Sequence, residues 1–291
     1  MNRPIRATAC LLLAGLALPC LSACSTVVDF FGPRPDPVLV QLAAQAEASG
    51  STAHADALWA EVARLCGTKA DGQVPHSCEV DHTAAVAALD ATPAPEPLTA
   101  AVPAESRALI ISQAIDDAVA ASTDAADPAA DPVTDPAAEH AAEARLPVAQ
   151  KGDTLAGTDA EQATELLSWE HGVLWALNFA HAYADSDTAA RIDAAIDEHE
   201  NIARQLTAVL TDPPVEAAGY TAIADSPDAP ALPTDTASAA AFANALLDRT
   251  GEYWAAVTMG TPLPAGASES GTPVTPWLSY LIATSAQLRA A

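Results

Sequence analysis

The sequence predicts an all-α fold. The chain is rich in alanine, its apolar residues recur at helical spacing in several segments, and aromatic residues make up only 4% of its 291 residues. Alanine is the best helix former, whereas a large β-rich core needs the β-branched and aromatic residues that strands prefer. The chain is therefore expected to be helical over most of its length.

The first 23 residues have the organisation of an export signal. A basic start precedes an apolar run over residues 7–18, and the sequence Leu-Ser-Ala-Cys ends at Cys24. The run is short for a bilayer-spanning helix. The tetrapeptide resembles the lipobox of bacterial lipoproteins. This resemblance implies cleavage before Cys24, lipid attachment to its thiol and anchoring to the outer face of the cell membrane, with an ordinary secretory signal as the alternative.

Residues 24–37 form a proline-containing tether, and residues 38–121 form a helical segment. Helices are predicted over residues 38–48, 54–65, 81–89 and 106–120. Removal of the signal leaves Cys66 and Cys78 as the two cysteines that carry no lipid. An even pair in an exported chain predicts a disulfide. A zinc site made by both thiols with His76 and His82 is the alternative.

Residues 122–157 lose the helical pattern. The pair Asp-Pro recurs at residues 127–128, 131–132 and 135–136 among alanines and acids. Such residues form no apolar face and repel one another, so the segment is predicted to be an acidic linker. An exposed loop within one domain is the alternative for part of it.

Residues 158–291 are predicted to form four helices. The first, over residues 158–183, opens on Thr158-Asp159-Ala160-Glu161, which has the form of a capping box. The others are predicted over residues 186–210, 237–259 and 276–288. Their connections are short, long and intermediate in turn. This order indicates a four-helix bundle with one long crossover, the ferritin-like arrangement.

Scattered positions in this region resemble the DUF4439 family of exported ferritin-like proteins. These positions are Glu170-His171, Trp175, Tyr183, His199, Ala241-Phe242 and Glu252-Tyr253. The resemblance covers just under half of the chain. It implies a ferritin-like fold and brings no settled activity.

Three ionisable residues are candidates for chemistry in the bundle. Glu170 and His199 each lie on an apolar helical stripe, and Glu252 follows Phe242 and Ala245 at core spacing. Together they could hold one iron or manganese ion. A complete di-iron set is not expected, because the Glu-x-x-His pairs are missing and the last helix has no acid or histidine. The alternative is a buried Glu–His hydrogen bond that serves packing.

The other histidines and most of the tryptophans are given ordinary structural positions. Solvated faces are expected for His54, His140, His171 and His181. The core is expected to hold Trp169, Trp175, Trp254 and Trp277, and the alternative is that aromatic residues line a pocket between helices.

A net charge of −26 argues against nucleic acid as a partner. No Gly-x-Gly-x-x-Gly sequence or P-loop supports nucleotide binding, and no Gly-x-Ser-x-Gly elbow supports a hydrolase.

These observations predict a lipid-anchored extracytoplasmic protein. Its expected role is non-enzymatic binding or scaffolding, with an envelope protein or a small ligand as the partner and no cofactor. The alternative is a metal-dependent redox or metal-handling protein that uses Glu170, His199 and Glu252.

Overall fold

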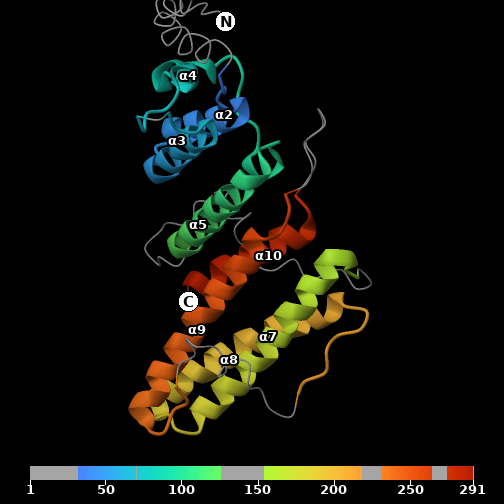
Figure 1. Cartoon of the computed structure of the whole chain (residues 1–291). Helices are drawn as coiled ribbons and strands as arrows, with labels where there is room; N and C mark the ends of the chain where they lie inside the picture. The colour runs from blue at the N-terminus through green and yellow to red at the C-terminus, as the bar shows by residue number, and fades with distance from the viewer. Residues whose placement is uncertain (1–31, 70, 126–153, 218–230, 264–273, 291) are drawn as a thin grey trace, which may run out of the picture. The chain divides into compact units, whose positions relative to one another are not determined.

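The computed structural model describes residues 32–69, 71–125, 154–217, 231–263 and 274–290. These residues contain helices, turns and no strand, which confirms the predicted all-α class. The chain divides into two compact units, an N-terminal unit (residues 1–102) and a C-terminal unit (residues 103–291). Figure 1 labels the helices of both.

The N-terminal unit is built on a helical hairpin. Its helices are α2 (Pro37–Ala48), α3 (Thr52–Cys66) and α4 (His82–Ala88). Asp36 caps α2, since its Oδ1 atom accepts hydrogen bonds of 3.0 Å from the backbone N–H groups of Val38 and Leu39. The turn into α3 passes through Gly50 at φ +82°, a conformation that glycine adopts without a Cβ clash. The two helices bury leucines and alanines between them.

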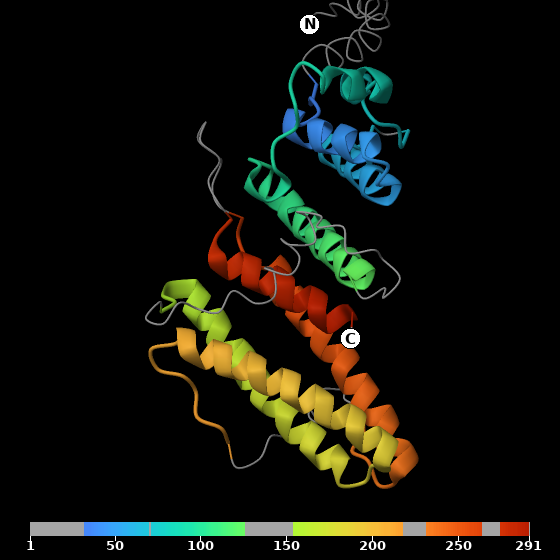
Figure 2. The same ribbon diagram turned by 180° about the vertical axis from the view of Figure 1, so that it is seen from behind.

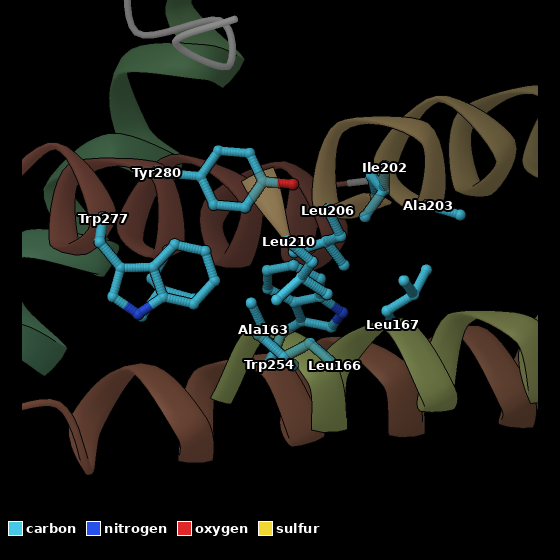
Figure 3. Packing of buried hydrophobic residues seen from close by; sticks show 11 residues of the cluster. Ala163, Leu166, Leu167, Ile202, Ala203, Leu206, Leu210, Trp254, Trp277 and Tyr280 are labelled. Carbon is cyan, nitrogen blue, oxygen red and sulfur yellow. The ribbon is translucent and has the colours of Figure 1, made fainter. Parts of the chain in front are cut away.

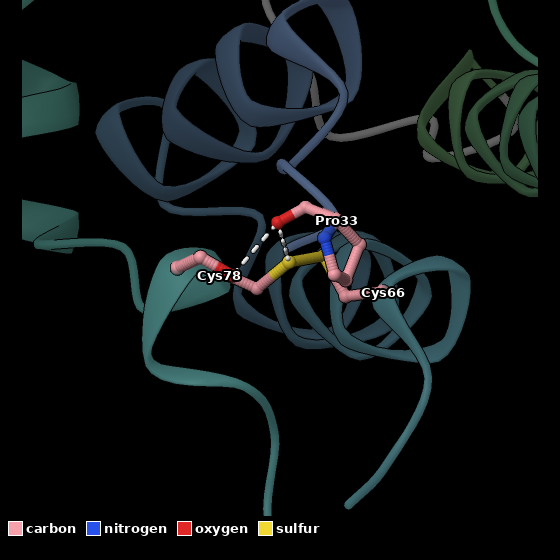
Figure 4. Close-up of a disulfide and its surroundings, with 4 residues drawn as sticks. Pro33, Cys66 and Cys78 are labelled. Carbon is pink, nitrogen blue, oxygen red and sulfur yellow. Dashed lines mark hydrogen bonds between the residues drawn. A yellow bond between two sulfur atoms is a disulfide. The ribbon is translucent and has the colours of Figure 1, made fainter. Parts of the chain in front are cut away.

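Cys66, the last residue of α3, forms a disulfide with Cys78, as predicted (Figure 4). The zinc alternative has no support, because both sulfur atoms are used and the histidines have other partners. His76 Nδ1 lies 2.6 Å from Glu79 Oε2, and the His82 ring stacks on Trp59.

The disulfide also lies against the first described residues of the chain. The backbone carbonyl of Pro33 accepts a hydrogen bond of 2.9 Å from the Ser77 hydroxyl, and Cys78 Sγ lies 3.2 Å from the same oxygen (Figure 4). The part of the predicted tether around Pro33 is thereby held on the loop between Cys66 and Cys78.

The described part of the C-terminal unit contains the four helices predicted for residues 158–291 and, before them, the helix predicted over residues 106–120. Its helices are α5 (Arg107–Ala125), α7 (Gly157–His181), α8 (Ser186–Val209), α9 (Thr236–Met259) and α10 (Pro276–Ala290). Helix α7 packs on α8 and α9, α9 packs on α10, and α10 packs on α5. Figure 2 shows α7 alongside α8 from behind.

Helix α5 belongs to the C-terminal unit, whereas the sequence analysis grouped its residues with the segment 38–121. The sequence placed this helix in the segment 38–121, but its buried residues Ile110, Ile111 and Ile115 belong to the C-terminal unit. Arg289 of α10 also pairs with Asp116 of α5 at 3.0 Å. An apolar face shows that a helix is buried but does not identify the helix that covers it. Most of the predicted linker lies outside the described residues, but the helices before and after it, α5 and α7, belong to the same unit.

The predicted capping box at the start of α7 was wrong. The helix begins at Gly157, its N-cap Ala156 makes no side-chain cap, and Thr158 lies inside the first turn. A capping box instead opens α9, where Asp235 Oδ1 accepts from the Ser238 N–H and the Ser238 hydroxyl accepts from the Asp235 N–H.

One hydrophobic cluster of the C-terminal unit is shared by the four helices α7 to α10 (Figure 3). Its buried members are Ala163, Leu166, Leu167, Ile202, Ala203, Leu206, Leu210, Trp254, Trp277, Tyr280 and Leu281. Trp254 and Trp277 are therefore core residues, as predicted. Helices α9 and α10 come close at Gly251, where an added Cβ would lie 3.2 Å from the backbone oxygen of Leu288.

Candidate functional site

Glu170 of α7 and His199 of α8 meet in the interior of the C-terminal unit. Both side chains are at most 1% exposed, and His199 Nδ1 lies 2.6 Å from Glu170 Oε2. The sequence placed each residue on a buried stripe, and the packing of α7 on α8 brings the two stripes together. Because an ionised carboxylate only accepts hydrogen bonds, an ionised Glu170 requires the proton on His199 Nδ1.

A third helix completes this buried network. The Nε1–H group of Trp254, on α9, donates a hydrogen bond of 2.6 Å to Glu170 Oε1. Each carboxylate oxygen of Glu170 therefore has a partner. The sequence analysis assigned Trp254 to the core and missed this bond. A buried indole carries one N–H that needs an acceptor, so the sequence could have predicted a polar partner for Trp254 in the core.

Glu252 does not join the network. It is exposed, and the buried stripe of α9 runs through Leu246, Thr250 and Trp254 instead. The predicted spacing counted from Ala245, which is also exposed. Two residues along a helix correspond to about 200°, so Glu252 lies roughly opposite Thr250 and Trp254. Within the described residues no three His, Cys, Asp or Glu side chains are grouped as a metal would require, and Glu252 does not lie with Glu170 and His199.

Tyr280 of α10 faces the network without completing it. Its hydroxyl points from α10 toward α8 (Figure 3), and neither this hydroxyl nor that of Thr284 has a hydrogen-bond partner of normal geometry among the described residues. Burial raises the pKa of Tyr280, and the negative charge of Glu170 raises it further. The phenol therefore stays protonated well into the alkaline range.

A pocket of about 570 Å³ is lined by α7, α8 and the segment that follows α8. It is lined by His171, Leu174, Trp175, Asn178, Glu200, Ala203, Arg204, Thr207, Glu216 and Ala217. Its volume falls within the usual range for small-molecule sites, about 300–1,000 Å³. The alternative of an aromatic-lined pocket between helices thus has a physical counterpart here, in which Trp175 is the aromatic residue.

His171 lies on the wall of this pocket rather than on a solvated face. Its side chain is 8% exposed, and its Nε2 atom is 4.0 Å from Glu216 Oε1. The prediction was wrong because α7 packs on both α8 and α9, so its buried arc is wider than one stripe. Trp175 is half-buried beside it and stacks on Phe179, with 5.8 Å between ring centroids.

The remaining predicted positions lie away from both sites. His181 is exposed and 3.2 Å from Asp193, and His54 is half-buried in the N-terminal unit. Trp169 is half-buried at the edge of the core, where it stacks on Tyr253 at 4.1 Å. Cys24 and His140 lie outside the described residues.

Comparison of the chain with protein families, with curated proteins and with solved structures finds no match. The ferritin-like relationship therefore remains a prediction that rests on the residues quoted above.

Proposed function

We propose that this chain is a lipid-anchored extracytoplasmic binding module that holds a small ligand in the pocket between α7 and α8. The observation that carries the proposal is the contrast between two groups of polar side chains. Glu170 and His199 are closed off in the interior, whereas Glu200, Arg204 and Glu216 line an open pocket.

The closed state of Glu170 favours a structural role over a catalytic one. A catalytic acid, base or metal ligand must reach substrate or an ion. Both oxygens of Glu170 already have partners, one on α8 and one on α9, and the side chain is 0% exposed. A buried Glu–His–Trp network of this kind fixes how the three helices pack.

Export and anchoring are supported by two features. The sequence that ends at Cys24 resembles a lipobox, and the Cys66–Cys78 disulfide suits an oxidising compartment outside the cytoplasm. Nine positions separate Cys24 from Pro33, which is attached to the disulfide loop. A chain of that length spans at most about 30 Å, so a lipid on Cys24 would keep the N-terminal unit near the membrane. Among the described helices, none combines the length and apolar character needed to cross a bilayer.

A ferritin-like bundle is part of the same proposal. Helices α7 to α10 share one core, the connection from α7 to α8 is short, and the connection from α8 to α9 is long. These are features of a bundle with one long crossover. Helix α5 then packs on α10 as an added element.

The anchor is tested by metabolic labelling with a radioactive fatty acid followed by membrane fractionation. Cys24→Ala is expected to abolish labelling and to release the chain from the membrane fraction. Cys20→Ala is the matched control, because Cys20 lies in the predicted signal and its loss should change neither result. Full labelling of Cys24→Ala would overturn the anchor.

Binding is tested by native mass spectrometry of the purified full chain in detergent. The probe is a mixed set of free amino acids, dipeptides, monosaccharides and nucleosides. A one-to-one adduct is expected that is lost in Arg204→Ala and kept in Arg191→Ala, a matched exposed arginine of α8 outside the pocket. No adduct with any member, or an adduct that Arg204→Ala leaves unchanged, would contradict the proposed pocket.

A further inference from the structure

The pocket is lined by charged side chains of both signs. Glu200 and Arg204 lie one turn apart on α8 and both line the pocket. A glutamate four residues before an arginine on a helix lies within reach of it and can form an ion pair. Here the Arg204 guanidinium donates to Asn201 Oδ1 at 3.1 Å, and Glu200 has no hydrogen-bond or ion-pair partner among the described residues.

A second carboxylate comes from a different part of the chain. Glu216 follows α8 and is 75% exposed, with its Oε1 atom 4.0 Å from His171. The pocket thus holds two carboxylates and one guanidinium. Two carboxylates disfavour an anion, and Arg204 disfavours a plain cation, so a ligand that carries both charges satisfies the most side chains.

The pocket also offers an apolar wall. Leu174 and Trp175 are both half-buried on α7 and line the pocket together with the charged residues of α8. An indole ring binds apolar or aromatic groups through its face and tolerates a nearby ammonium group. The overall charge of −26 favours the approach of an ammonium group as well.

Resting on the proposed function, we infer that the pocket takes a zwitterion of the amino-acid or short-peptide class. Its ammonium group lies between Glu200 and Glu216, its carboxylate lies against Arg204, and its apolar side chain lies on Trp175. The volume of about 570 Å³ is sufficient for a dipeptide.

The test is isothermal titration calorimetry of the purified full chain in detergent with the dipeptide alanyl-phenylalanine. Three peptides are compared: the free dipeptide, its N-acetyl form and its C-terminal amide. Each block removes one charge, and each is expected to weaken binding at least tenfold. The Arg204→Ala variant is expected to bind the free dipeptide more weakly than the parent and to bind the free and amidated dipeptides with equal affinity. The double variant Glu200→Gln/Glu216→Gln is expected to bind the free dipeptide more weakly and to bind the free and acetylated dipeptides with equal affinity.

Arg191→Ala is the control and should leave all three affinities unchanged, and circular dichroism verifies that each variant is folded. Equal binding of free and blocked peptides would overturn the zwitterion assignment, as would no binding of the free dipeptide. If a sugar or nucleoside instead forms an adduct that Arg204→Ala abolishes, the proposed function stands and the ligand class is wrong. If no member of the mixed set binds, both the proposed ligand pocket and the zwitterion assignment are wrong.

Discussion

Glu170→Ala is expected to destabilise the C-terminal unit strongly. The substitution removes the partner of two buried polar groups, since His199 Nδ1 and Trp254 Nε1 both lie 2.6 Å from its carboxylate oxygens. Each polar group left without a partner costs about 1–3 kcal/mol, so the two together cost about 2–6 kcal/mol. Breaking a buried pair by removing one member typically costs about 3–5 kcal/mol, which lies within that sum. We therefore expect a loss of about 3–5 kcal/mol in the free energy of unfolding.

The assay is denaturant unfolding of the full chain followed by tryptophan fluorescence. Glu252→Ala is the matched control, because this exposed glutamate should change stability by no more than about 0.5 kcal/mol. The double variant Glu170→Leu/His199→Leu should lose less free energy of unfolding than the two single variants lose in sum. Neither member of the pair then stays buried without the other. A loss for Glu170→Ala no larger than that for Glu252→Ala would refute the reasoning.

Three further predictions concern other positions of the C-terminal unit. Gly251→Val should destabilise the unit by about 1–3 kcal/mol, because even a Cβ atom would lie 3.2 Å from the Leu288 carbonyl oxygen. Thermal unfolding measures the loss, and unchanged stability would contradict the close approach of the two helices. Tyr280→Phe should be neutral or stabilising by about 1 kcal/mol, since its buried hydroxyl has no partner of normal geometry among the described residues; a clear loss in urea unfolding would disprove this. Hydrogen bonds from the Ser238 hydroxyl and backbone N–H lower the pKa of Asp235, so its contribution is present above the ordinary pKa of about 3.9 and is lost as pH falls through the lowered value. Asp235→Asn keeps an acceptor at every pH, so its melting temperature should match the parent at pH 7 and fall less between pH 5 and pH 3; equal acid sensitivity would contradict the cap.

The sequence was sufficient to locate the helices, because their apolar periodicity is a local property. The structure places α8 at Ser186–Val209 against a prediction of 186–210, and α9 at Thr236–Met259 against 237–259. The disulfide followed from the number of cysteines and the expected compartment. The meeting of Glu170 with His199 followed from a carboxylate and an imidazole on facing stripes.

The features that the sequence did not reveal depend on which elements meet. The partner of α5 could not be deduced, because an alanine-rich helix with an isoleucine face fits any apolar surface of similar shape. His171 was misplaced because the number of neighbours around α7 sets the width of its buried arc. Glu252 was misplaced by a phase error on α9, where alanines give little indication of which face is buried. The pocket combines residues from two helices and the segment that follows α8, so no local sequence pattern predicts it.

The central claim is that Glu170 and His199 hold the helices together and that ligand binding occurs elsewhere. It is tested most directly by elemental analysis of the full chain, purified without chelators and then incubated with iron and with manganese. The account predicts far less than one equivalent of either metal per chain, because both oxygens of Glu170 are already hydrogen-bonded. Metal near one equivalent that is retained in Glu252→Ala and lost in Glu170→Gln would contradict it and would make the buried pair a metal centre.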